Sequence, residues 1–152
     1  MEPKKVYKSF RFENHLRWTT GRRAILSAAG KPDLETSSPP EFKGEAGFWT
    51  PEDLFLASVN LCTLLTFVAF AQNKRLELAS YESRVEGLIE SAEGKYRYTE
   101  VTLHPRLEVR SSEDLERARA ILDDAHKACF ISNSITSTVK VIPDIRVTAQ
   151  AA

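Results

Sequence analysis

The chain has 152 residues, 42% of them hydrophobic and 28% charged, which is enough for one ordinary domain with a single core. Its 21 basic residues balance its 21 acidic residues, so no net field attracts it to nucleic acid or to an anionic membrane. We therefore expect one domain over residues 1–152, with no nucleic-acid or membrane partner. The N-terminus lacks the apolar core of a secretory signal, so we also expect a cytoplasmic protein.

The first third of the chain is predicted to form short strands followed by a long loop. Polar and apolar residues alternate over residues 4–12, and the pattern continues through residues 15–20 and 23–27. Glycine, proline and serine are then frequent over residues 29–48, which predicts a surface loop. A loop of this length is either part of a binding site or disordered, and the sequence leaves both readings open.

A long helix is predicted to begin after Thr50. Thr50 can cap this helix, and Pro51 suits its first turn. Glu52 and Asp53 add negative charge at the positive end of the helix dipole. Residues 54–73 are apolar on nearly every face, which is typical of a helix buried in a core. A membrane span is the rival reading, but polar residues interrupt the run and the flanking strands need a soluble core.

The second half of the chain predicts a hairpin, a second helix and a final strand. Residues 76–90 and 96–110 read as two strands joined by a turn. An apolar stripe then predicts a helix that ends near Cys129. Residues 137–147 form a last strand, which Pro143 places at an edge or interrupts. The order of elements indicates an α+β fold, with mainly antiparallel sheets around a long buried central helix.

The two cysteines are the strongest candidates for chemistry. Cys62 lies in the predicted buried helix, and Ser58 and Thr66 share its helix face. Such a polar stripe either lines a cavity or bonds to its own backbone, and free cysteines are often plain core residues. A reactive Cys62 would need a nearby cation to stay ionised, and Arg22 and Arg23 are the candidates.

The second cysteine, Cys129, has His126 three residues before it. This pair invites a metal site or a Cys–His nucleophile. A zinc site needs further ligands, however, and His15 and His104 lie in strand patterns with no matching partner. We therefore expect no metal and no bound cofactor. We expect His126 to be an exposed residue near the negative end of the second helix.

Three stretches of the sequence together resemble the OsmC/Ohr family of thiol peroxidases. They are TPEDLFLASVNLCTLLTFVAFA, the hairpin that follows it, and DDAHKACFISNSI. The matching features are a Pro-Glu helix start before the first cysteine and a second cysteine in an AHxxC context followed by a Ser-Asn pair. The resemblance implies an OsmC-like fold in an intertwined homodimer, in which each active site draws residues from both subunits.

The resemblance also implies roles for five residues. Cys62 matches the thiol that attacks the peroxide, and Cys129 matches the thiol that then forms a disulfide with it. Glu52 matches a carboxylate that orients an arginine. Either Arg22 or Arg23 matches that arginine, with Arg23 slightly preferred. The implied substrate is an organic hydroperoxide, or hydrogen peroxide, in oxidative or osmotic stress defence, and the implied reductant is an external dithiol of the lipoyl type.

Other readings of the sequence stay open. Phe130 stands where many family members have proline, which leaves the substrate preference undecided. Phe55, Leu65, Phe67 and Phe130 can line a pocket for an alkyl tail or simply pack in the core. The chain could also be a catalytically silent module that binds a small apolar ligand, or a purely structural dimer.

Overall fold

The structure is a computed structural model that describes residues 1–149. Its residues fall into two compact units, of which the first is Met1–Asp53 and the second begins at Leu54. The single domain expected over residues 1–152 stays a prediction.

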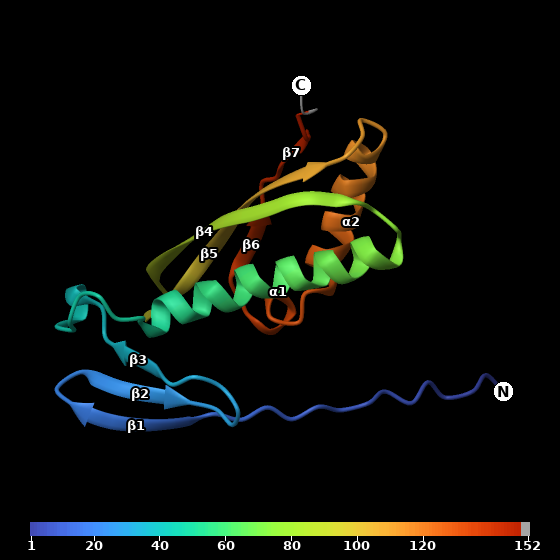
Figure 1. Cartoon of the computed structure of the whole chain (residues 1–152). Coiled ribbons are helices and arrows are strands. Elements are labelled where there is room, and N and C mark those ends of the chain that lie inside the picture. The colour runs from blue at the N-terminus through green and yellow to red at the C-terminus, as the bar shows by residue number, and fades with distance from the viewer. Residues whose placement is uncertain (150–152) are drawn as a thin grey trace. The chain divides into compact units, whose positions relative to one another are not determined.

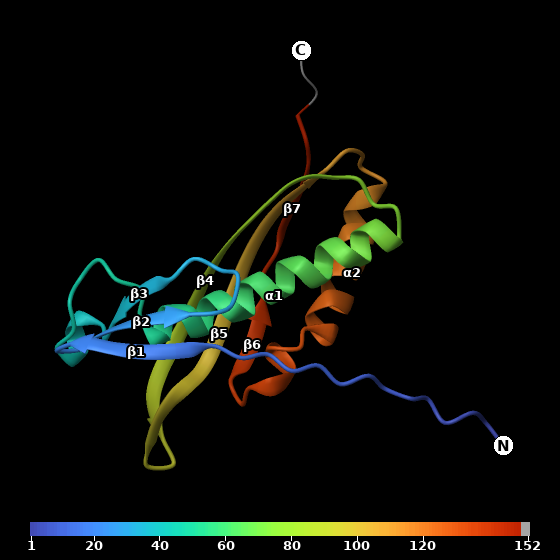
Figure 2. The same ribbon diagram turned by 60° about the horizontal axis from the view of Figure 1, so that its bottom comes forward.

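The first unit contains a three-stranded antiparallel sheet in the order β1-β2-β3. Its strands are β1 (His15–Thr20), β2 (Arg23–Ser27) and β3 (Leu34–Ser37), which lie side by side in Figures 1 and 2. β1 and β2 are confirmed as predicted. Gly21, at φ +53°, takes the left-handed conformation that the tight turn between them requires.

Two predictions for this unit were wrong. Residues 4–12 form no strand, because no described strand pairs with them and an unpaired strand has no hydrogen-bond partners. The predicted loop over residues 29–48 contains β3 and a short 3-10 helix, η1 (Pro40–Phe42). Its glycines and prolines mark the ends of these short elements rather than one continuous loop. The large apolar side chains of the N-terminal segment are exposed: Val6, Tyr7, Phe10 and Phe12.

Two helices and a second sheet build the rest of the chain. The helices are α1 (Pro51–Asn73) and α2 (Asp114–Ala128), both close to their predicted bounds. The predicted cap of α1 is confirmed, because the Asp53 N–H donates to the Thr50 hydroxyl at 3.1 Å. In return the Thr50 N–H donates to the Asp53 carboxylate at 3.1 Å, which completes a reciprocal cap.

The second sheet is centred on β5. Its strands are β4 (Leu78–Ala92), β5 (Lys95–Val109), β6 (Thr138–Val141) and β7 (Asp144–Val147). β4 and β5 form the predicted antiparallel hairpin, a long twisted ribbon along which α1 runs in both views (Figures 1 and 2). β6 and β7 pair with the other edge of β5 in parallel, because the chain first crosses back through α2. The predicted interruption at Pro143 is confirmed.

Helix α1 is buried along one stripe. Phe67 packs with Leu107 of β5 and Ile121 of α2 in the main core of this unit. Leu61 and Leu65, by contrast, are 56% and 57% exposed. The helix is long and apolar enough to cross a membrane, with a mean hydropathy of 2.1, yet its stripe packs as a core helix does. The all-round burial that its sequence predicts is therefore not reached within a single chain. The buried residues recur at every fourth position: Val59, Thr63, Phe67 and Ala71.

Candidate functional site

The structure brings two of the predicted site residues together. Cys62 lies in the middle of α1, and Cys129 is the residue that ends α2. Both are free thiols, and the Cys62 side chain lies close enough to Cys129 to lower the pKa of its thiol. Cys62 is half-buried, whereas Cys129 is 0% exposed. A reagent from solvent can therefore approach Cys62, but it cannot approach Cys129 without a rearrangement.

Hydrogen-bond donors surround the sulfur of Cys129. The Thr63 hydroxyl lies 3.8 Å from it, and the Ser132 N–H donates to it at 3.5 Å. Burial raises the pKa of the Cys129 thiol, but hydrogen bonds from Ser132, Cys62 and Thr63 outweigh burial, so the pKa is lowered. The site therefore stabilises the thiolate form of Cys129 relative to a thiol in water, although this residue is fully buried.

The turn that follows α2 places Ser132 against Cys129. Ser132 begins the 3-10 helix η2 (Ser132–Ser134), which folds the chain back over the end of α2. The Asn133 N–H donates to the Cys129 carbonyl at 3.0 Å, and the Asn133 side chain donates to the Lys127 carbonyl at 3.0 Å. These bonds hold the turn on the end of the helix, so the position of Ser132 is fixed by its neighbours.

The other predicted site residues, Arg22, Arg23 and Glu52, lie in the first unit. Arg23 is half-buried, with its guanidinium 4.3 Å from the centre of the Phe48 ring and 3.6 Å from the Glu35 carboxylate. Arg22 is exposed, and Glu52 is half-buried in the first turn of α1. The pairing of either arginine with Cys62, and the role of Glu52, stay predictions.

Sequence reasoning missed Thr63 as a partner of Cys129 and misjudged His126. The missed signal was the period of the buried stripe, because Thr63 lies one turn from each of Val59 and Phe67.

The predicted exposure of His126 was wrong. This residue is half-buried and its Nδ1 atom is buried with no hydrogen-bond partner among residues 1–149. His126 directly follows Ala125, the last buried residue of the apolar stripe of α2, and this position brings the histidine partly into the core.

The residues considered for an alkyl pocket separate into two groups. Phe67 is 0% exposed in the core, and Phe55 stacks on Tyr98 with ring centres 4.6 Å apart, so these two pack internally. Leu65 and Phe130 are 57% and 81% exposed and remain candidates for contact with a ligand.

Within residues 1–149, no three His, Cys, Asp or Glu side chains gather as a metal site.

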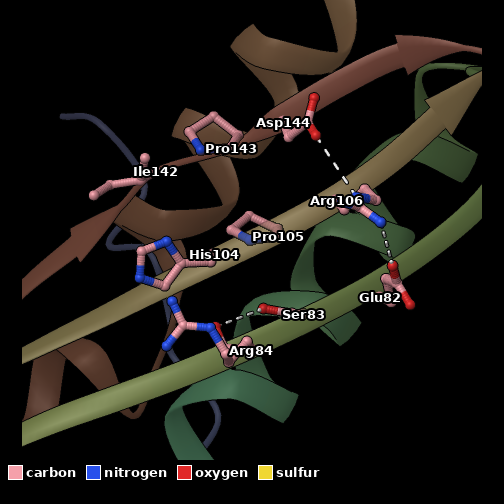
Figure 3. A pocket seen from close by; sticks show the side chains of 9 residues that line it. All are labelled: Glu82, Ser83, Arg84, His104, Pro105, Arg106, Ile142, Pro143 and Asp144. Atoms are coloured by element: carbon pink, nitrogen blue, oxygen red, sulfur yellow. Dashed lines mark hydrogen bonds and ion pairs between the residues drawn. The ribbon is translucent and has the colours of Figure 1, made fainter.

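A separate hollow of about 570 Å³ lies on the outer face of the second sheet (Figure 3). It opens where Pro105 of β5 lies opposite the break at Pro143, because neither proline has an N–H to pair across the sheet. Arg106 bridges Glu82 at 3.3 Å and Asp144 at 3.6 Å across the hollow. Neither cysteine lines it, and its charges are paired, as is typical of a solvated strand face.

Comparisons with known proteins agree with this architecture. The family model for OsmC-like protein matches residues 44–144. An OsmC-like protein of unknown function from Vibrio cholerae is 22% identical, with a TM-score of 0.81 over 89% of this chain and 99% of that one. No curated protein is significantly similar in sequence.

Two organic hydroperoxide resistance proteins have similar structures. The one from Legionella pneumophila, described as OsmC, is 23% identical, with a TM-score of 0.70 over 91% of this chain and 100% of that one. The one from Elizabethkingia anophelis is 19% identical, with a TM-score of 0.72 over 93% of this chain and 100% of that one. These likenesses confirm the predicted α+β fold.

Proposed function

The chain belongs to the OsmC-like protein family, as its sequence predicted, and we propose that it is a cysteine peroxidase that reduces organic hydroperoxides. The observation that carries the proposal is the proximity of two free thiols, of which one is half-buried and one fully buried. The names of the hydroperoxide resistance proteins with this fold support the substrate class. Hydrogen peroxide is a second substrate in this proposal.

The two thiols divide the reaction between them. Cys62, as a thiolate, attacks the terminal oxygen of the hydroperoxide, the O–O bond breaks, and the alkoxide leaves as an alcohol after it takes a proton. Cys62 is now a sulfenic acid. The Cys129 thiolate attacks the sulfur of that sulfenic acid, a disulfide forms, and hydroxide leaves as water after protonation. An external dithiol of the lipoyl type then reduces the disulfide by exchange and is itself oxidised to a disulfide.

An arginine of the first unit keeps Cys62 ionised in this proposal. Arg23 is the preferred candidate, since the Phe48 ring and the Glu35 carboxylate already hold its guanidinium in place. Arg22 is the second candidate, and its exposed side chain has more freedom to lose on binding. Glu52 orients the arginine through a charge-assisted hydrogen bond.

We propose a homodimer as the working form, in the cytoplasm and in defence against oxidative or osmotic stress. The exposed apolar face of α1 supports the dimer, since a large apolar patch on a protein surface usually marks an interface. The N-terminal segment, with Tyr7, Phe10 and Phe12 all exposed, supports it further. In such a dimer each active site draws residues from both subunits.

The peroxidase proposal is tested by oxidation of the reduced protein. We expect one equivalent of cumene hydroperoxide to convert both thiols to an intramolecular disulfide, seen by intact mass, with hydrogen peroxide reacting more slowly. Cys62→Ser should abolish the reaction, whereas Cys129→Ser should stop at a sulfenic or sulfinic acid on Cys62. Unchanged thiols with both oxidants would exclude a peroxidase and leave a ligand-binding module or a structural dimer.

The role of the arginine is tested by a matched pair of variants. Arg23→Gln should slow the first oxidation of Cys62 by roughly 10- to 100-fold at neutral pH, because the thiolate loses its cation. Arg22→Gln should have a much smaller effect. Stopped-flow measurement of the first step in the Cys129→Ser background isolates this effect, and a larger loss in Arg22→Gln would reverse the assignment.

A further inference from the structure

Two hydroxyl side chains lie against the sulfur of Cys129, and they come from different parts of the second unit. Thr63 is on the buried stripe of α1, and Ser132 is at the start of η2. The Thr63 oxygen lies 3.8 Å from the sulfur, and the Ser132 backbone N–H donates to the sulfur at 3.5 Å. The Ser132 hydroxyl is buried with no hydrogen-bond partner within residues 1–149, and it lies close enough to the sulfur to lower the pKa of Cys129.

The Thr63 hydroxyl has one proton and two acceptors. It donates to the Val59 carbonyl at 2.9 Å, and the sulfur of Cys129 is its alternative acceptor at 3.8 Å. While Cys129 is a thiol, the bond to Val59 satisfies the hydroxyl, as is common for threonine in helices. Once Cys129 is ionised, a small rotation of the hydroxyl redirects its proton to a charged acceptor, which makes the stronger hydrogen bond.

We propose that Thr63 and Ser132 are positioning residues for the second chemical step, in which they hold Cys129 as a thiolate directed at Cys62. This inference rests on the proposed function, since it concerns the step that forms the disulfide. A thiolate already present beside Cys62 attacks the sulfenic acid as soon as it forms. Fast attack protects Cys62 from a second peroxide, which would oxidise it irreversibly to a sulfinic acid.

The electrostatics of the site agree with this role. Burial alone raises the pKa of a thiol, and the pKa of Cys129 is nevertheless lowered, with Ser132 as the strongest opposing contribution and then Cys62 and Thr63. Among titratable side chains, Cys62 on α1 contributes to this shift, and His126 lies three residues before Cys129 on α2. The His126 backbone carbonyl accepts a hydrogen bond from the Cys129 N–H at 3.3 Å. The contributions that lower this pKa are hydrogen bonds, and no cation is among them.

The first test measures the thiolate itself and needs no peroxide. In a Cys62→Ser background, which keeps a donor beside Cys129, ultraviolet absorbance follows its ionisation against pH. The double variant lacking both thiols is subtracted to remove the tyrosine signal. We expect Thr63→Val and Ser132→Ala each to move the titration to higher pH, and Thr63→Ser to restore it. Thr102→Val, which removes another buried hydroxyl, should leave it unchanged.

The second test measures disulfide formation after a single turnover. With both cysteines present, Thr63→Val should slow closure of the disulfide roughly 10-fold at neutral pH and increase the sulfinic acid product seen by mass. The loss should disappear at high pH, where Cys129 is ionised in every variant. A merely structural effect of the substitution would not vanish with pH.

The outcomes separate this inference from the proposed function. An unchanged titration in both Thr63→Val and Ser132→Ala overturns the inference, even if the protein is a peroxidase. A shifted titration together with faster or unchanged disulfide closure overturns it as well. Cys62 that does not react with any peroxide refutes the peroxidase, and with it the second step.

Discussion

At the scale of single residues, Cys129 shows how hydrogen bonds can oppose burial. The residue is 0% exposed, which by itself would favour the neutral thiol. Donors from Ser132, Cys62 and Thr63 reverse this preference and lower the pKa. Cys62 lies next to it but is half-buried, so the two thiols have different access to solvent. The proposed division of the reaction between the two thiols rests on these differences in solvent access and in pKa.

The lowered pKa of Cys129 predicts a specific pH dependence of stability. In the unfolded chain this thiol ionises near its ordinary value of 9.0, and in the folded chain it ionises at lower pH. Between the two values the unfolded state binds more protons, so the free energy of unfolding rises with pH. The stability that Cys129 contributes is fully present above the pKa of the unfolded chain. It is lost as the pH falls through the lower pKa of the folded chain.

The measurement compares the reduced wild type with Cys129→Ser. Denaturant unfolding at equal protein concentration, from about pH 7 to about pH 9, should show that the wild type gains stability relative to the variant as pH rises. Other titrating groups cancel in the difference. Two parallel curves would mean that Cys129 ionises alike in the folded and unfolded states.

At the scale of elements, the sequence predicted those whose stability is mostly local. The cap at Thr50, the reversal between β4 and β5, and the apolar stripe of α2 each depend on residues close in sequence, and each was confirmed. β3 was missed, because its four residues form a strand only by pairing with β2. Residues 4–12 alternate as a strand does, yet no described strand offers them a partner.

The turn of the β4–β5 hairpin gives a prediction at this scale. Ala92 pairs with Lys95, so the loop is the two residues Glu93 and Gly94, both at positive φ, +53° and +77°. This is the geometry of a type I′ turn, which favours asparagine followed by glycine. Gly94→Ala should lower the free energy of unfolding by about 1 kcal/mol through backbone strain, since no atom lies within 4 Å of the added carbon.

The matched change at the other turn residue should have the opposite sign. Glu93→Asn should raise the free energy of unfolding by roughly 0.5 kcal/mol, because asparagine adopts this conformation more readily than glutamate. Denaturant titrations with equal slopes would measure both changes. If Gly94→Ala proved neutral, Gly94 would not hold its positive φ in solution.

At the scale of the whole molecule, the sequence could identify the two cysteines but not their contact. Cys62 and Cys129 lie on different helices, and only the packing of α1 and α2 on one sheet brings them together. Thr63 was missed for the same reason, because its partner comes from another element. The need for a cation beside Cys62 pointed to Arg22 and Arg23, whereas the slight preference for Arg23 and the role of Glu52 came from the family resemblance, and all of these remain predictions.

The exposed face of α1 predicts that a charge placed there will dissociate the proposed homodimer. Leu65 is 57% exposed in the single chain, and in a symmetric dimer each substitution counts twice. Burial of a leucine contributes about 1.5 to 3 kcal/mol, so Leu65→Glu should weaken association at least about 100-fold. Sedimentation at matched concentrations should then find a dimer for the wild type and a monomer for the variant.

The control is an equally exposed residue on a different surface. Ile142 is 55% exposed on the outer face of the second sheet, beside the hollow of Figure 3, and Ile142→Glu should leave the dimer intact. If Leu65→Glu also lost its reaction with hydroperoxide while each chain stayed folded, the active site would need both subunits. If the wild type itself sedimented as a monomer, the apolar face of α1 would need another partner, and an arginine from the same chain would have to approach Cys62.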